Sequence, residues 1–214
     1  MIFADRLDAG RRLGEALRPR VVERPAVVLA IPRGGVVVGE AVAGALEVPL
    51  DVVVPRKVGA PGNPELGIGA IAPGVRVLDR RSIERLRVSP EYLEREIAHQ
   101  EHEIERRERI YRAGRPPTEL AGAVAVVVDD GIATGGTAVA ALRWARLAGA
   151  TRVVLAVPVA PAATLAGLRT EADAVVVLAT PEPFLAVGEW YGAFEQTSDE
   201  EVVETLARTS GHAA

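Results

Sequence analysis

One run of residues, Val124–Thr137, limits the fold of this chain more than any other segment. Its apolar, mostly β-branched first part indicates a strand of a parallel sheet, because strands covered on both faces lack polar alternation. The strand ends in two adjacent carboxylates, Asp129 and Asp130, and a loop rich in glycine and threonine then leads into an apolar helix. Open α/β sheets bind ligands at this carboxyl end of their strands. The run therefore predicts a parallel α/β domain with a ligand site at this strand end.

The loop after the acidic pair has the composition of a phosphate-binding loop. Gly131, Gly135 and Gly136 allow backbone N–H groups to converge on an anion, and the following helix adds the positive end of its dipole. Thr134 and Thr137 add hydroxyl donors. The two carboxylates suit sugar hydroxyls or a hydrated metal ion beside the phosphate. A phosphate next to a diol predicts that the ligand is a sugar phosphate.

The order of residues in this run excludes two common phosphate motifs. A Walker loop needs a lysine after its last glycine, where this chain has Thr137, and a dinucleotide fingerprint has glycines directly after the strand. An acidic pair alone is often a polar turn or a helix cap. With its loop, however, Val126–Thr137 closely resembles the 5-phosphoribosyl-1-pyrophosphate (PRPP) motif of type I phosphoribosyltransferases, in which two acidic residues precede a Thr-Gly-Gly-Thr loop.

A second segment supports this resemblance. The turn containing Arg33, Gly34 and Gly35 follows another apolar strand, predicted at 26–31. Its small residues expose backbone N–H groups, and a guanidinium can fork two phosphate oxygens. An ordinary βα turn would have a similar composition. In type I phosphoribosyltransferases, however, the loop at this position holds pyrophosphate, and the turn is similar to that loop.

A third segment, rich in glycine and proline, is predicted to form a mobile loop at about 55–67. Arg56 and Lys57 stand near its start, which resembles the catalytic loop of the family, in particular the Arg-Lys start found in adenine-type enzymes. Lys57 is the only lysine among 25 basic residues. A compact ammonium differs in function from a planar guanidinium, which favours a specific role, and a solvated surface loop is the alternative.

Alternating strands and helices indicate a central parallel sheet with helices on both faces. We expect one phosphoribosyltransferase-like domain over residues 1–214, with a core at about 26–178 and a small hood built from the termini, its tail at about 179–214. Besides the motif strand, expected strands are 26–31, 50–54, 67–72, 75–78, 152–157 and 174–178, and expected helices are 5–17, 36–46, 90–112, 137–147, 161–168 and 199–208.

The resemblance implies a reaction and a role for each motif. A phosphoribosyl group would pass from PRPP to a nitrogenous acceptor, expected to be a nucleobase, with release of pyrophosphate, as in nucleotide salvage. The family pattern gives catalytic roles to Lys57, Asp129 and Asp130, the two aspartates also contacting Mg²⁺ directly or through its waters. The PRPP-binding residues implied are Arg33, Gly34, Gly35, Arg56, Lys57, Asp129, Asp130, Gly131, Ala133, Thr134, Gly135, Gly136 and Thr137.

The expected acceptor site lies in an aromatic segment, although the chain as a whole is only 4% aromatic. In the family, the segment after the last core strand forms part of the hood over the acceptor. We therefore expect a planar acceptor to contact Trp190 and Tyr191, with backbone groups near Val187. The alternative is that these rings fasten the tail to the core. Ala133 replaces a third acid of hypoxanthine–guanine enzymes, which disfavours those acceptors without establishing adenine.

Composition restricts the remaining classes of protein. Hydrophobic residues make up 49% of the chain, yet no uncharged stretch reaches transmembrane length, and the first residues do not form a signal peptide. The absence of cysteine excludes disulfides and thiolate metal sites. We therefore expect a cytoplasmic protein without a membrane partner, and the family resemblance implies Mg²⁺ as its cofactor. His99 and His102 are expected at the surface. The sequence allows a homodimer and does not decide the oligomeric state.

The main alternative function is a PRPP-sensing regulator that keeps the fold and binds RNA. The arginine-rich stretch 80–115 is its best support, but ten arginines are interleaved there with eight glutamates. This pattern favours a solvated helix over a phosphate-binding stripe, and the net charge of −4 also disfavours a nucleic-acid partner. A diphosphokinase that makes PRPP would need an ATP site, for which the sequence gives no motif.

Overall fold

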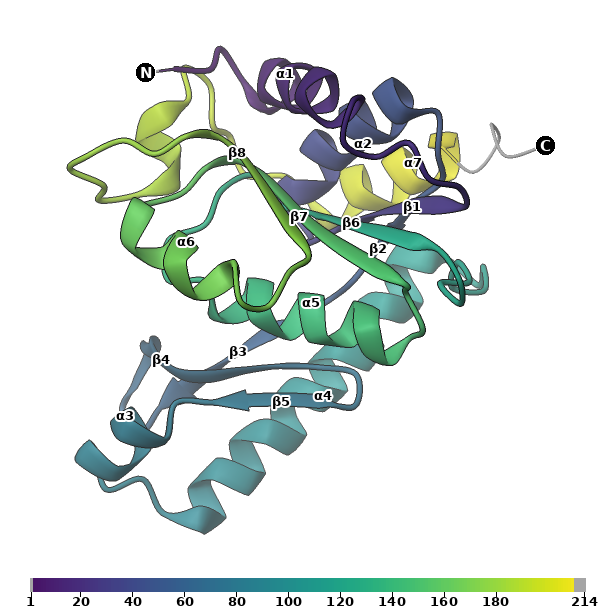
Figure 1. The fold of residues 1–214 in the computed structure, drawn as a ribbon. Helices are drawn as coiled ribbons and strands as arrows, with labels where there is room; N and C mark the ends of the chain where they lie inside the picture. The colour runs from purple at the N-terminus through teal and green to yellow at the C-terminus, as the bar shows by residue number, and fades with distance from the viewer. Residues whose placement is uncertain (1, 210–214) are drawn as a thin grey trace.

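The computed structural model describes residues 2–209 and contains a central sheet whose five strands are all parallel (Figure 1). Their order is β2-β1-β6-β7-β8. Every residue of β1 and β6 is buried, as the continuous apolar runs predict. The strands are β1 (Ala26–Ala30), β2 (Leu50–Val52), β6 (Val124–Val128), β7 (Arg152–Val159) and β8 (Ala174–Ala179).

Helices cover both faces of this sheet. Alternate residues of β1 divide between two apolar clusters, Val28 in one and Val27 and Leu29 in the other. The first cluster contains α1 (Arg6–Leu17), α2 (Gly34–Leu46) and α7 (Asp199–Thr209), and the second contains α5 (Gly136–Leu147) and α6 (Ala162–Leu168). The expected α/β fold, a parallel sheet between two helical layers, is confirmed (Figure 1).

A small antiparallel sheet lies apart from the central one and consists of β3 (Arg56–Ala60), β4 (Asn63–Ala72) and β5 (Val75–Leu78). The expectation of a loop at 55–67 is therefore wrong, because β3 and β4 form an antiparallel hairpin across that stretch, with an irregular register around Gly59. The glycines pack the strands closely: a side chain on Gly59 would lie 2.8 Å from Pro64 Cα, and one on Gly69 would lie 2.6 Å from the Val77 carbonyl oxygen.

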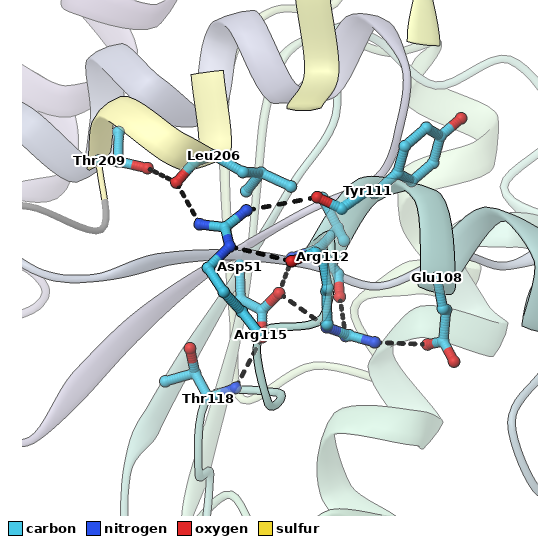
Figure 2. Close-up of polar contacts among 9 residues, drawn as sticks. Asp51, Glu108, Tyr111, Arg112, Arg115, Thr118, Leu206 and Thr209 are labelled. Carbon is cyan, nitrogen blue, oxygen red and sulfur yellow. Dashed lines mark hydrogen bonds and ion pairs between the residues drawn. The ribbon is translucent and has the colours of Figure 1, made fainter. Parts of the chain in front are cut away.

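The long helix α4 (Pro90–Arg112) follows α3 (Arg80–Arg85) and connects the small sheet to the central one. At its end, Arg112 donates through Nε to Asp51 Oδ1 at 3.2 Å and through Nη2 to the Val52 carbonyl at 2.9 Å (Figure 2). Asp51 also accepts from the backbone N–H of Thr118 at 2.7 Å. Both charged side chains are buried, so the edge strand β2 is fixed to α4.

The residues around Phe3 pair with the segment that follows β8, and these two segments together are called the hood below. Phe3 N–H donates to the Trp190 carbonyl at 3.0 Å, and Gly192 N–H donates back to the Phe3 carbonyl at 2.8 Å. A short 3₁₀ helix, η1 (Val187–Trp190), precedes this contact. No helix within residues 2–209 is both long enough and apolar enough to cross a membrane.

Candidate functional site

The acidic pair stands directly after β6, at the carboxyl edge of the sheet. Asp129 Oδ1 accepts a hydrogen bond of 2.8 Å from the backbone N–H of Asp130. Burial, together with the charge of Asp130, raises the pKa of Asp129 well above its usual range. Burial also raises the pKa of Asp130, although the neighbouring Arg6 guanidinium opposes this. Two carboxylates held this close repel each other unless a cation or a diol lies nearby.

Arg6, at the start of α1, provides one positive charge for this pair. Its Nε donates to Asp130 Oδ2 at 2.7 Å, and its Nη1 donates to the Glu195 carbonyl at 2.7 Å. The guanidinium also lies 3.8 Å from the centre of the Phe194 ring. Arg6 thus connects the acidic pair to the hood. The sequence carries no motif for this role, because Arg6 begins an ordinary amphipathic helix.

The donor set at the β6 end fits Mg²⁺. Two carboxylates share a single arginine, so the pair keeps negative charge for a cation. Within residues 2–209 no group of three or more His, Cys, Asp or Glu side chains could hold a metal ion. Magnesium often uses one or two carboxylates, together with substrate oxygens and retained waters. Asp129 and Asp130 therefore suit an ion that is completed by its substrate.

The glycine loop leads from the acidic pair to the N-terminus of α5. Gly135 caps this helix with φ 84° and ψ −6° and, having no side chain, makes no capping hydrogen bond. A side chain on Gly131 would lie 2.4 Å from Val187 Cγ1, and one on Gly135 would lie 2.9 Å from Thr164 Cγ2. Ala133 and Thr134, by contrast, are exposed. The loop is thus held in place where Gly131 and Gly135 pack against neighbouring side chains. Its exposed side leaves the N–H groups at the start of α5 available to an anion.

The turn after β1 packs directly on the acidic pair. Ile31 N–H donates to the Val128 carbonyl at 2.8 Å, which joins the two strand ends. A side chain on Gly34 would lie 1.9 Å from Asp130 Oδ2, and one on Gly35 would lie 3.0 Å from the Cα atom of Asp129. The peptide bond before Arg33 is cis. The structure therefore brings together the two segments that the sequence separates.

Arg56 and Lys57 lie on opposite faces of the small sheet. Lys57 pairs with Ala70, and directly paired residues lie on the same face of a sheet. The Cβ atom of Ala70 lies 3.8 Å from the position that a Cβ on Gly136 would have. Lys57 is therefore on the face toward the phosphate loop. Its Nζ contacts the exposed carboxylate of Glu65 at 2.9 Å. Arg56 is on the other face, where its Nε donates to Gln100 Oε1 of α4 at 2.9 Å.

The hood places the expected acceptor residues in different environments. Tyr191 is buried, with its ring 5.4 Å from Phe3 and 4.9 Å from Phe194, and its hydroxyl donates to the Asp130 carbonyl. Burial raises the pKa of Tyr191. Trp190 is partly buried, 6.1 Å from Phe184 between ring centres. The geometry fits the fastening of the tail to the core, and acceptor contacts by Val187, Trp190 and Tyr191 stay predictions.

A surface cavity of about 570 Å³ lies away from this site. It lies between the C-terminal ends of α2 and α7, is lined by residues such as Glu47, Pro49 and Arg208, and touches none of the expected site residues. His99 and His102 are exposed on α4, as expected. The third histidine, His212, lies outside the described residues.

Comparison with known proteins places this arrangement in a family. Residues 5–182 match the model of the phosphoribosyl transferase domain. Two proteins from strains of Mycobacterium tuberculosis, named provisionally as phosphoribosyl transferases, are 48% identical over 208 residues, which make up 97% of this chain and 47% of each relative. The chain thus spans about half the length of these curated relatives. A crystal structure from Thermus thermophilus is 45% identical, with a TM-score of 0.82, covering 98% of this chain and 99% of that one.

Proposed function

Because the chain belongs to the phosphoribosyltransferase family, we propose that it transfers the 5-phosphoribosyl group of PRPP to a nitrogenous acceptor and releases pyrophosphate. The observation that carries this proposal is the contact between the turn at Gly34 and the carboxylate of Asp130. This contact joins an anion-binding turn, an acidic pair and a phosphate loop at adjacent strand ends. Such a row matches the diphosphate, ribose and 5-phosphate of PRPP in their covalent order.

In the proposed reaction the bond between ribose C1 and the diphosphate oxygen breaks, while the acceptor nitrogen bonds to C1 and releases its proton. Positive charge develops on the sugar ring and negative charge on the departing pyrophosphate. The loop 133–137 and the start of α5 hold the 5-phosphate and so fix the position of C1. Asp129 and Asp130 accept from the ribose hydroxyls. The backbone of Gly34 and Gly35, with the Arg33 guanidinium, stabilises the leaving charge.

Mg²⁺, when bound with PRPP, would neutralise diphosphate charge beside Asp129 and Asp130. Arg6 contacts the same acidic pair and orients it. Since its Nε holds Asp130 Oδ2 at 2.7 Å, the remaining oxygen of that carboxylate keeps one orientation for the ribose. Lys57, on the face of the small sheet toward the phosphate loop, is the proposed second cation for the pyrophosphate. It would have to leave Glu65 to act there.

The proposed acceptor is a planar nitrogenous base bound under the hood. Val187 packs against Gly131, so the 3₁₀ helix η1 borders the phosphate loop. Trp190 is partly exposed, and stacking on such a ring contributes about 0.5–1.5 kcal/mol beyond burial. Ala133 leaves the site without the third acid expected for hypoxanthine or guanine. We place the reaction in the cytoplasm, as part of nucleotide salvage.

The RNA-binding alternative gains no support from α4. Glu103 pairs with Arg106, and Glu108 pairs with Arg112. Much of the positive charge of this helix is therefore neutralised within the chain. A phosphate-binding stripe would instead present its arginines without acidic partners.

The decisive experiment measures pyrophosphate release from PRPP and Mg²⁺ with a panel of nucleobases. We expect release with at least one base and none without an acceptor. The double variant Asp129→Asn/Asp130→Asn is the matched control, and it should lose release while it remains folded. Absence of PRPP binding to the wild-type protein in titration calorimetry would refute the proposal. PRPP binding without release for any base, combined with a shift of RNA in salt, would favour the regulator.

A further inference from the structure

One face of α4 carries polar side chains toward the carboxyl edge of the sheet. Gln100, Arg107 and Tyr111 are seven and four residues apart, which places them on the same face of a helix. Gln100 accepts from Arg56 Nε at 2.9 Å. The Tyr111 hydroxyl donates to Asp199 Oδ1 of α7 at 2.7 Å. This face therefore lies against the start of β3 and the start of α7.

Three arginines converge around this face. Arg33 Nη1 lies 3.7 Å from Asp199 Oδ1, the same oxygen that Tyr111 contacts. Arg107 lies one helical turn before Tyr111. Burial lowers the pKa of Arg56, and the nearby charge of Arg107 lowers it further. The three guanidiniums come from three separate segments, namely the turn after β1, the start of β3 and the middle of α4.

None of these arginines has a short contact with a carboxylate among the described residues. The Asp199 oxygen is 3.7 Å from Arg33, beyond hydrogen-bond distance. Glu103 lies 3.9 Å from Arg107 Nε and instead accepts closer hydrogen bonds, both 3.1 Å, from Arg106. Arg56 contacts a neutral amide. The Arg107 Nε atom is buried and has no hydrogen-bond partner within residues 2–209. Buried donors of this kind normally have an acceptor.

We propose that Arg33, Arg56 and Arg107 form one anion subsite, which takes the terminal phosphate of the diphosphate of PRPP. This assignment rests on the proposed function and adds a residue, Arg107, that lies outside every PRPP motif. Planar guanidiniums bind phosphate oxygens through paired hydrogen bonds. The subsite lies at the β1 and β2 ends of the sheet, and the phosphate loop is on the other side of β1, at β6.

Asp199 is the internal counter-ion of this subsite. It lies among the arginines and keeps one oxygen on the Tyr111 hydroxyl, but it contacts Arg33 only loosely. A phosphate group would replace it as the partner of Arg33. Loss of the Asp199 charge should therefore strengthen phosphate binding, whereas loss of the Arg107 charge should weaken it. A merely structural role for these two residues would not produce opposite effects.

The test is titration calorimetry of the full chain with two probes, inorganic pyrophosphate and ribose 5-phosphate. For Arg107→Ala we expect the Kd for pyrophosphate to rise about tenfold or more, a factor that corresponds to ~1.4 kcal/mol. The Kd for ribose 5-phosphate should change less than about twofold, since that probe binds at the β6 end. Arg107→Lys should recover part of the loss, and Asp199→Asn should lower the Kd for pyrophosphate. Arg109→Ala, exposed on the same helix, is the matched control.

The possible results separate this inference from the proposed function. Unchanged pyrophosphate binding in Arg107→Ala overturns the subsite and leaves the proposed function intact. Wild-type protein that binds ribose 5-phosphate but not pyrophosphate also overturns the subsite alone. Equal loss of both probes in Arg107→Ala and Arg107→Lys, with a lower melting temperature, assigns Arg107 to the core and overturns it as well. Wild-type protein that binds neither probe refutes the proposed function together with the subsite.

Discussion

Removal of the Arg6 side chain should destabilise the protein through the acidic pair rather than through α1. In the Arg6→Ala variant, Asp130 loses its charged hydrogen bond of 2.7 Å, and the Phe194 ring loses a guanidinium 3.8 Å from its centre. The Arg6 and Asp130 side chains are only 12% and 15% exposed. Because water reaches this pair poorly, the carboxylate that remains cannot recover its lost partner by solvation.

Two of the three lost contacts set the size of the effect, because the third, to the Glu195 carbonyl, is exposed. A hydrogen bond to a charged group contributes about 1.5–3 kcal/mol, and a cation–π contact contributes about 0.5–1 kcal/mol. We therefore expect a loss of about 2–4 kcal/mol in the free energy of unfolding. For a chain of 214 residues the entropy of unfolding is about 0.45 kcal/mol per kelvin, so the melting temperature should fall by about 4–9 °C.

A double-mutant cycle, measured by chemical and thermal denaturation, tests the cause. In the Arg6→Ala background, Asp130→Asn should be stabilising, because it removes a carboxylate charge that has lost its partner. In the wild type the same substitution breaks the ion pair with Arg6. The expected coupling is about 1 kcal/mol or more. The control is Arg12→Ala, because Arg12 pairs with Asp8 on the same helix with 51% of its side chain exposed, and it should cost under about 1 kcal/mol. Additive effects of the two changes, within about 0.5 kcal/mol, would refute the reasoning.

Three further predictions concern the rest of the site. Because the folded state raises the pKa of Asp129, ionisation of this carboxyl lowers the free energy of unfolding as the pH rises above the usual pKa of 3.8. Without Mg²⁺, Asp129→Asn should therefore have a higher melting temperature than wild type at pH 7, and this difference should vanish near pH 3.8. Melting temperatures of the two proteins that run parallel across this pH range would contradict the prediction. Gly135→Ala should cost about 1–2 kcal/mol because φ is 84° and should weaken binding of ribose 5-phosphate. Gly167→Ala, with nothing within 4 Å of the added methyl, is its control in both measurements. Lys57→Arg should lower the turnover rate of pyrophosphate release more than it weakens PRPP binding in calorimetry, and equal turnover would show that the lone lysine has no special role.

Features that depend on neighbours in the sequence were predictable. The helix expected at 90–112 has the same bounds in the structure, because Ser89 caps it and Ile97 and Ile104 repeat on its buried face. The expected strand ends, with Asp129 and Asp130 on one and Arg33 on the other, are correct for the same reason. Both follow from apolar runs that end in polar residues.

Features that depend on distant contacts were not predictable. Arg6 and Asp130 are 124 residues apart in sequence, and neither position carries a local signal for their pairing. Arg107 lies in a helix whose charge pattern indicates solvent on every polar face. The glycine and proline content around Gly59 predicts a loop, whereas the structure has a hairpin there. Glycine is needed in this hairpin because the strands approach closely, and composition does not show that approach. Topology, rather than local pattern, decides each of these cases.

The register of β1 against β6 has a consequence for the order in which the chain folds. Ala26 pairs with Val124, and the small sheet and α4 lie between these strands in the sequence. Contacts close in sequence tend to form early, whereas pairing across a long loop must first overcome the entropy of closure. We expect the segment 56–112 to become ordered before β6 joins β1, with its end already attached to β2 through Arg112. A molecule that has lost only the β1–β6 pairing would keep this segment folded, yet its acidic pair and its anion-binding turn would be apart.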